Sequence, residues 1–407
     1  MKKHFIFFII VLIGISSCKK ELNVPEDSEN NKNLNSLLTL KIGENILYLQ
    51  DFVMNPAEVD SITGSSVKLN CQLDRKRITG KLTVLPDMEH FVDVKLWIKG
   101  IPYSVPCRKT DKLDYLFTFN PQGKIYNKVQ IAGQMNDWVP SLSPNLKLNR
   151  KGIYEVTLNL SPGTYLYQMS LDGQQNHDAN NPAKVDNGYG KFNSILQVAG
   201  EKDKLPVLYT SEFTDKNITL LAQKKISKVF VYWQNYRLSD EFIKVENGKI
   251  IFDIPKEAEN LTRSFIRVWA SNEFGVSNDV LIPLENGKVL TTSNEITRSD
   301  KHAQIIYFML VDRFKDGDKT NNHPMNRPDV NHKVDYWGGD LSGLKQKIDD
   351  EYFTKLGVNT LWISPLNQNP VQPYGYYAPM KTKFSGYHGY WPVSSSKVDF
   401  RFGTNKQ

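Results

Sequence analysis

Several residues near the end of the chain carry oxygen atoms at a spacing that suits a metal ion. They lie in two loops and are Asp316, Asp318, Asn321, Asn322, Gly338 and Asp340. A hard cation such as Ca2+ takes six to eight oxygen ligands from carboxylates, amides and backbone carbonyls. An EF-hand is excluded, because its sixth and twelfth positions would be Asn321 and Arg327 in place of Gly and Glu. We predict a Ca2+ site here; a solvated loop rich in Asp and Asn is the alternative.

A second group of residues could bind a sugar. The stretch Tyr387-His388-Gly389-Tyr390-Trp391 places aromatic rings and an imidazole around a glycine at a strand-loop junction. Flat aromatic faces pack against the apolar face of a sugar ring, and polar groups beside them bond its hydroxyls. We predict that Tyr390, His388 and Trp391 bind substrate, with a purely structural loop as the alternative.

A strand, a helix and a second strand must position both groups. The apolar run that begins at Ile305 ends in charge at Asp312, which is typical of a strand buried on both faces. Apolar residues then recur at helical spacing, at Leu341, Leu344, Ile348 and Tyr352. Gly357 ends this helix before a second buried strand over residues 358–364, in which Trp362 is expected to be core. This order is that of one βαβ unit.

Residues 301–407 resemble the opening quarter of the barrel of the α-amylase family, glycoside hydrolase family 13. The phrases that carry the resemblance are IIYFMLVDRFKDGD, VDYWGGDLSGLKQKID, YFTKLGVNTLWISPL and GYHGYWPVSSSKVDFRFGT, in this order. The resemblance implies a (β/α)8 TIM barrel whose catalytic groups lie at the C-terminal ends of its strands. The expected fold class is therefore multidomain, with immunoglobulin-like or early-set β-sandwiches followed by the first βαβ part of the barrel.

The resemblance also assigns roles to the residues above. The implied metal ligands are the carbonyl of Gly338 and the side chains of Asp316, Asp318, Asn321, Asn322 and Asp340. Tyr390 would stack on the sugar just before the scissile bond, and His388 would contact the same ring. Asp312, Arg313 and Trp391 would support the barrel mouth.

Catalytic carboxylates are not identifiable in this sequence. A retaining glycosidase needs two carboxyl groups about 5 Å apart, one as nucleophile and one as acid/base. The family places its Asp, Glu and Asp on the fourth, fifth and seventh strands, and this chain stops before the third. The carboxylates after Asp340 are Asp349, Asp350, Glu351 and Asp399, and none matches a catalytic position. We expect the catalytic residues beyond Gln407 and an incomplete barrel that is inactive alone.

The amino terminus predicts export and lipid anchoring. Residues 1–17 combine two lysines with an apolar core and small residues, which is typical of a signal peptide. The sequence around Cys18 resembles a bacterial lipoprotein box, so lipid on Cys18 would hold the protein at an outer-membrane or periplasmic surface. An ordinary cleaved signal and an uncleaved anchor are the alternatives. Residues 18–35 form a flexible tether.

Charge argues against a nucleic-acid partner. The formal net charge is +7, and Lys2 and Lys3 would leave with the signal peptide. The remaining lysines are scattered among strand-like segments and form no basic run, which indicates solvated faces.

Residues 36–120 alternate in short strands and predict a β-sandwich. No chemical constellation is visible in it, so a spacer or packing module is the simplest interpretation. Export would permit a disulfide between Cys71 and Cys107, and two buried free thiols are the alternative.

Residues 121–200 resemble the early-set β-sandwich of glycogen-binding domains, carbohydrate-binding module family 48. Trp138 stands at a matching aromatic position and Asn193 at a matching amide. The second tryptophan that the family pattern places after DGQ is absent, since Gln175 stands there. A structural or docking role is therefore weighed against contact with starch.

Residues 205–294 predict a third, immunoglobulin-like sandwich. Its aromatics Trp233, Tyr236 and Trp269 are expected in the core, with a sugar platform as the alternative. Together these features predict the amino-terminal part of an exported enzyme acting on α-glucans such as starch or maltodextrin. The alternatives are a surface lipoprotein that binds α-glucans without cleaving them, and an inactive truncated product.

Overall fold

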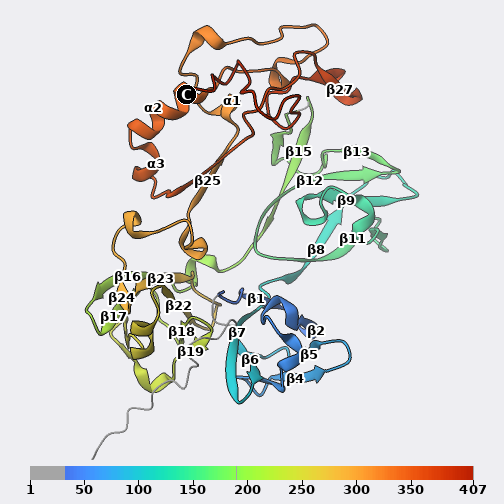
Figure 1. The fold of residues 1–407 in the computed structure, drawn as a ribbon. Coiled ribbons are helices and arrows are strands. Elements are labelled where there is room, and N and C mark those ends of the chain that lie inside the picture. Colours follow the sequence, from blue (N-terminus) through green and yellow to red (C-terminus); the bar gives the residue numbers. More distant parts are fainter. Residues whose placement is uncertain (1–32, 189, 407) are drawn as a thin grey trace, which may run out of the picture. The chain divides into compact units, whose positions relative to one another are not determined.

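A computed structural model describes residues 33–188 and 190–406 (Figure 1). The predicted signal peptide, Cys18 and most of the tether lie outside these residues. In the described part of the chain, no helix is both long and apolar enough to span a bilayer. The chain divides into two compact units: one joins the residues up to Lys109 with Lys204–Leu290, and the other joins Thr110–Asp203 with the residues from Thr291 onward.

The first block of the first unit is a sandwich of two sheets. The order of one sheet is β1-β7-β6-β3 and that of the other is β2-β5-β4. The strands are β1 (Leu38–Leu40), β2 (Gly43–Tyr48), β3 (Ser61–Gly64), β4 (Leu69–Asp74), β5 (Thr79–Val84), β6 (Phe91–Ile98) and β7 (Ile101–Lys109). The β6–β7 hairpin turns at Lys99 and Gly100, whose φ angles of 51° and 80° suit a tight two-residue turn.

The second block of this unit also has two sheets, ordered β16-β17-β21-β20 and β19-β18-β22-β23-β24. The strands are β16 (Leu208–Phe213), β17 (Asn217–Ala222), β18 (Lys228–Trp233), β19 (Tyr236–Arg237), β20 (Ile243–Glu246), β21 (Lys249–Asp253), β22 (Ser264–Ser271), β23 (Val280–Glu285) and β24 (Lys288–Val289). Trp233, Tyr236 and Trp269 are 1%, 4% and 1% exposed, so the core interpretation of these aromatics is confirmed.

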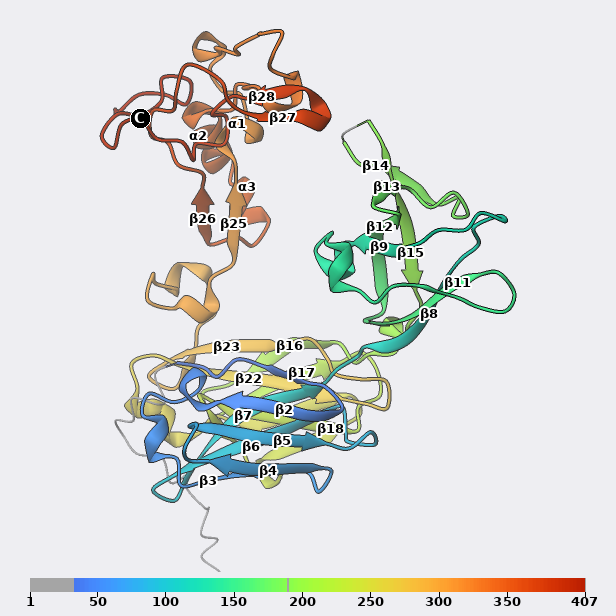
Figure 2. The same ribbon diagram turned by 90° about the vertical axis from the view of Figure 1, so that its right-hand side faces the viewer.

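The two blocks share one hydrophobic core, although the glycogen-binding-like domain separates them in sequence. Buried residues of both blocks form a single cluster that includes Leu82 and Val268. Phe91 of the first block packs against Phe230 and Trp269 of the second, with ring centroids 4.4 and 5.4 Å apart. The strands of both blocks lie together in one body (Figure 2). The two predicted sandwiches are therefore halves of one unit.

Cys71 and Cys107 are both free thiols in this unit, Cys107 fully buried and Cys71 partly buried. Burial raises the pKa of the Cys71 thiol to about 11 and that of Cys107 further. Both thiols are therefore protonated at neutral pH.

The glycogen-binding-like domain begins earlier than the predicted residue 121. Strand β8 (Leu113–Phe119) pairs along its whole length with β11 (Tyr154–Leu160), so the boundary lies near Thr110. Its sheets are β10-β11-β8 and β13-β12-β15-β14, with β9 on β12. The other strands are β9 (Val129–Gly133), β10 (Lys147–Leu148), β12 (Gly163–Leu171), β13 (Gln174–Asn176), β14 (Lys184–Asp186) and β15 (Phe192–Val198).

The last part of the chain contains the predicted βαβ unit. Strand β25 (Ile306–Met309) pairs in parallel with β26 (Thr360–Ile363), and α2 (Leu341–Asp349) lies between them in sequence. The remaining elements are α1 (Val311–Phe314), α3 (Tyr352–Lys355), β27 (Tyr374–Tyr377) and β28 (Thr382–Phe384). The predicted fold class, β-sandwich domains followed by a partial barrel, is confirmed.

Two details of the barrel prediction were wrong. The single predicted helix breaks at Glu351, which has a φ of 57°, and Ile348 is 51% exposed. The strands are not buried on both faces, because Phe308 and Trp362 are 51% and 60% exposed. Met309, Leu344 and Phe353 form the small core on the covered face.

Candidate functional site

Asp340 organises the oxygen-rich loops. It caps α2, because its Oδ1 accepts from the amides of Gly343 at 2.7 Å and Gly317 at 3.1 Å. Its Oδ2 accepts from the amide of Asp318 at 2.9 Å and from Nδ2 of Asn321 at 3.0 Å. One buried carboxylate therefore holds the loop that follows α1 against the start of α2.

Three oxygens in this loop are left without hydrogen bonds. Oδ1 of Asp316, Oδ1 of Asn321 and Oδ1 of Asn322 are all buried and have no hydrogen-bond partner among the residues that the structure describes. Nδ2 of Asn322 donates to the other carboxylate oxygen of Asp316 at 2.7 Å, so two of these side chains lie together. An unpartnered buried polar atom costs about 1–3 kcal/mol, which a cation at these oxygens would offset.

Gly338 lies beside the same group of oxygen atoms. Its φ is +91°, and a Cβ added to it would lie 2.3 Å from Oδ1 of Asn322. The backbone of Gly338 therefore approaches the orphaned oxygen as no other residue could without strain. Asp318 differs from the other members, because its Oδ1 accepts from Thr320, which lowers the pKa of Asp318.

The oxygen atoms of these loops come from amides and from a few carboxylates, which are ligands that a hard cation accepts. Among residues 33–188 and 190–406, no group of three or more His, Cys, Asp or Glu side chains could hold a metal ion. The chemistry that remains is that of Asp316, Asn321 and Asn322, whose free oxygens suit Ca2+ and not a soft metal.

The predicted sugar-binding loop, residues 387–391, follows β28. His388 Nδ1 accepts from the amide of Tyr390 at 3.0 Å, and its ring stacks on Tyr390 and meets Trp391 edge-on at 4.6 Å. Tyr390 is 50% exposed, so one ring face is open to a ligand. Burial lowers the pKa of His388, which favours the neutral ring that this hydrogen bond requires. Gly389 has a φ of +83° and lies against the carbonyl of Pro365.

Arg313 connects the two groups of residues. Its guanidinium lies 4.0 Å from the ring centroid of Tyr387 and 4.3 Å from that of Trp337. Its neighbour Asp312 accepts from the amide of Trp337 at 3.0 Å, and burial raises the pKa of Asp312 to about 6. The predicted metal loop and the predicted sugar loop thus meet near the C-terminal ends of β25 and β26, where a barrel carries its active site.

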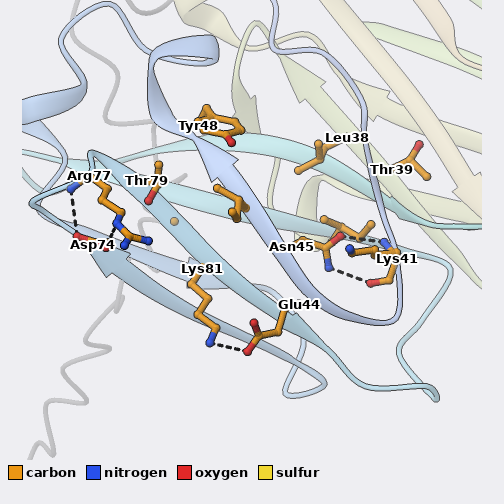
Figure 3. A pocket seen from close by; sticks show the side chains of 13 residues that line it. Leu38, Thr39, Lys41, Glu44, Asn45, Tyr48, Asp74, Arg77, Thr79 and Lys81 are labelled. Atoms are coloured by element: carbon orange, nitrogen blue, oxygen red, sulfur yellow. Dashed lines mark hydrogen bonds and ion pairs between the residues drawn. The ribbon is translucent and has the colours of Figure 1, made fainter. Parts of the chain in front are cut away.

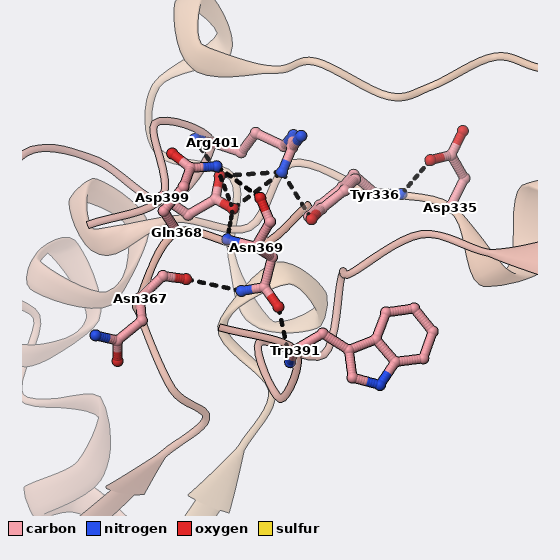
Figure 4. A network of polar contacts seen from close by, with 8 residues as sticks. All are labelled: Asp335, Tyr336, Asn367, Gln368, Asn369, Trp391, Asp399 and Arg401. Atoms are coloured by element: carbon pink, nitrogen blue, oxygen red, sulfur yellow. Dashed lines mark hydrogen bonds and ion pairs between the residues drawn. The ribbon is translucent and has the colours of Figure 1, made fainter. Parts of the chain in front are cut away.

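A buried polar network behind the sugar loop was not predicted (Figure 4). Asn369, which is 0% exposed, accepts from the amide of Trp391 at 2.9 Å and donates its own amide to Asp399 at 2.9 Å. Asp399 pairs with Arg401 at 3.0 Å, and Arg401 donates to the Tyr336 hydroxyl at 2.7 Å. Asp399 is therefore a structural carboxylate. The close spacing of Asp399 and Arg401 was the only feature of the sequence that could have predicted this network. Asn369 is distant from them in the chain.

The glycogen-binding-like domain presents one of its two predicted residues. Trp138 is 37% exposed and has a left-handed backbone conformation with a φ of 63°, and its amide donates a hydrogen bond to the carbonyl of Gly133. Asn193 is only 8% exposed, and its Oδ1 accepts from Nε2 of Gln168 at 3.0 Å. Trp138 is thus available to a ligand, whereas Asn193 lies within the sheet. Gln175 is exposed on β13.

Sequence comparisons agree with this geometry. Residues 308–407 match the family described as alpha amylase, catalytic domain. Residues 113–204 match the family described as the glycogen recognition site of AMP-activated protein kinase. The start of this second match agrees with the first residue of β8.

Curated relatives are similar to part of the chain. The chain is 37% identical over 120 residues to a cyclomaltodextrin glucanotransferase of Klebsiella oxytoca, covering 28% of this chain and 17% of that protein. It is 34% identical over 125 residues to an alpha-amylase of Niallia circulans, covering 30% of this chain and 22% of that protein. The matched stretch is therefore about a fifth of each relative.

Proposed function

We propose that this protein is the amino-terminal part of an exported glycoside hydrolase of the α-amylase family that acts on α-glucans. The observation that carries the proposal is the match of residues 308–407 to the alpha amylase catalytic domain. The open ring of Tyr390 and the orphaned oxygens of Asp316, Asn321 and Asn322 support it, because they lie at the active-site end of the strand pair.

Within this proposal, the residues of the chain bind and orient the sugar. Tyr390 stacks on one ring, and neutral His388 points its other nitrogen at a hydroxyl. Arg313 and Trp391 hold the loop in place. A retaining mechanism also needs two carboxylates, which are not among the residues that this proposal assigns to sugar binding.

Ca2+ is the proposed cofactor, with the carbonyl of Gly338 and the side chains of Asp316, Asp318, Asn321, Asn322 and Asp340 as its ligands. The unpartnered oxygens of Asp316, Asn321 and Asn322 support this assignment. Bound there, the ion would fix the loop after β25 relative to α2. The organising role of Asp340 suits a residue that shapes the site, and Asp318 contributes through the loop that it caps.

Binding of α-glucan by the glycogen-binding-like domain is also proposed, through Trp138. Its exposed ring is the supporting observation. Lipid on Cys18 would tether the protein to an outer-membrane or periplasmic surface, where it would meet extracellular glucans.

The test uses the protein encoded by the complete reading frame that contains residues 1–407. It should release reducing ends from starch and maltoheptaose with retention of anomeric configuration, and Tyr390→Ala should lower kcat/KM at least tenfold. Tyr209→Ala is the matched control, because Tyr209 is similarly exposed and far away in sequence. Binding of maltoheptaose without any cleavage would favour the alternative of a non-catalytic α-glucan-binding lipoprotein.

A further inference from the structure

The first sandwich carries a groove that neither family match covers. The groove has a volume of about 810 Å3 and lies over β1, β2 and β5 (Figure 3). The family matches cover residues 113–204 and 308–407, whereas the groove is built from residues 38–81. Its sequence showed no chemical constellation, because its residues become neighbours only when the strands pair.

Alternation along β2 points three side chains outward into solvent. Glu44, Ile46 and Tyr48 are exposed, whereas Leu47 between them is buried in the core. Ile46 and Tyr48 are 59% and 49% exposed. From Glu44 to Tyr48 the strand runs roughly 14 Å, which is long enough to meet more than one sugar ring.

The neighbouring strand supplies polar groups beside this apolar stripe. Thr79 lies directly across from Tyr48 in the β2–β5 register, and Lys81 lies directly across from Ile46. Directly opposite residues in an antiparallel pair have side chains about 5 Å apart. A hydroxyl and an ammonium therefore flank the aromatic ring and the aliphatic side chain.

Five charged side chains line the groove, and all except Lys41 form ion pairs with each other. Lys81 Nζ lies 2.5 Å from Glu44 Oε1, and Arg77 Nε lies 3.9 Å from Asp74 Oδ2. Both carboxylates of the groove thus have a cation beside them (Figure 3). Such a lining offers many hydrogen-bond donors and acceptors. Its net electrostatic attraction for a strongly charged ligand is small.

We infer that this groove is a separate binding site for a neutral maltooligosaccharide, with Tyr48 as its aromatic platform. An exposed ring and an aliphatic neighbour match the apolar face of a pyranose, and Thr79, Lys81 and Glu44 match its hydroxyls. The choice of an α-glucan rests on the proposed function; the site itself rests on the lining of the groove. The groove would let the protein bind a polysaccharide chain at a further point.

Hydrogen exchange on the full chain localises this binding. Adding maltoheptaose should slow amide exchange in peptides that span residues 43–48 and 79–84. Tyr48→Ala should raise the maltoheptaose concentration that gives half of the maximal protection about tenfold, as expected when an aromatic contact is lost. Tyr48→Phe keeps the ring and should retain it. Tyr209→Ala, at 47% exposure in the same unit, is the matched control and should have no effect.

The outcomes separate this inference from the proposed function. Protection around Tyr390 or Trp138 without protection of residues 43–48 would overturn the groove and leave the proposed function standing. Protection of residues 43–48 that persists in Tyr48→Ala would also overturn it. Protection by cellohexaose and not by maltoheptaose would overturn the assignment to α-glucans. Protection of residues 43–48 alone would support the groove while counting against the other two sugar sites.

Discussion

Arg237 on β19 donates a hydrogen bond of 2.7 Å to Asp93 on β6, across 144 residues of sequence. The Asp93 side chain is 0% exposed and that of Arg237 is 13% exposed. This ion pair lies where the two blocks of the first unit meet. It joins halves that the glycogen-binding-like domain separates along the chain.

Breaking this pair should destabilise the first unit strongly. Asp93→Ala leaves the guanidinium of Arg237 buried without its main partner, and removing one member of a buried pair costs about 3–5 kcal/mol. Urea unfolding followed by tryptophan fluorescence measures the effect. Asp349→Ala removes an exposed partner of Lys345 and should change the midpoint little. Equal effects of both substitutions would contradict the interpretation.

The two blocks should unfold together, because they share one core. The thiol of Cys107 reports on the first block through labelling in urea, since it is fully buried. Hydrogen exchange of β22 reports on the second block. The labelling and exchange midpoints should coincide, and two separate midpoints would show that the blocks are independent domains.

Calcium should stabilise the barrel portion. At a hundred times its Kd, a bound ion adds about 2.7 kcal/mol to the free energy of unfolding, which raises Tm. Asp316→Ala and Asn322→Ala should abolish this rise. Asp350→Ala, which removes an exposed carboxylate at the end of α2, should leave it intact. A protein whose Tm and calorimetric heat do not respond to Ca2+ would lack the site.

His388 should titrate below the ordinary histidine pKa of about 6.5, because its burial disfavours the charged ring. A lowered folded pKa means that the unfolded state takes up the proton first as pH falls. Stability is therefore fully present above pH 6.5 and is lost between 6.5 and the folded pKa. Protonation also removes the acceptor for the Tyr390 amide. A histidine-selective NMR titration, assigned with His388→Gln, measures the midpoint; a value above 6.5 would refute this.

Asn369 should act as a positioning residue for the sugar loop. Asn369→Leu keeps the volume but leaves the amide of Trp391 without its acceptor, at a cost of about 1–3 kcal/mol. Hydrogen exchange at Trp391 should accelerate, and maltoheptaose protection of the loop should weaken. The control is Asn367→Ala, whose side chain donates to Ser395 at the surface. Unchanged exchange at Trp391 would exclude the role.

Local sequence determined the parts of this protein whose cause is local. The βαβ order follows from periodicity and from Gly357, whose φ of +75° suits the residue after a helix. The residues of the two candidate loops could also be named, because oxygen-rich and aromatic stretches are visible in the sequence. Their roles came from resemblance to a family.

Contacts between distant residues were decided by the tertiary structure alone. Periodicity places Trp362 in an apolar strand but does not show what packs against it, and among the described residues its side chain is 60% exposed. It also cannot pair Asp93 with Arg237 or bring Asn369 beneath Trp391, since such contacts depend on how whole elements pack. The groove beside Tyr48 has the same origin: alternation placed its side chains outward, and strand pairing made them neighbours.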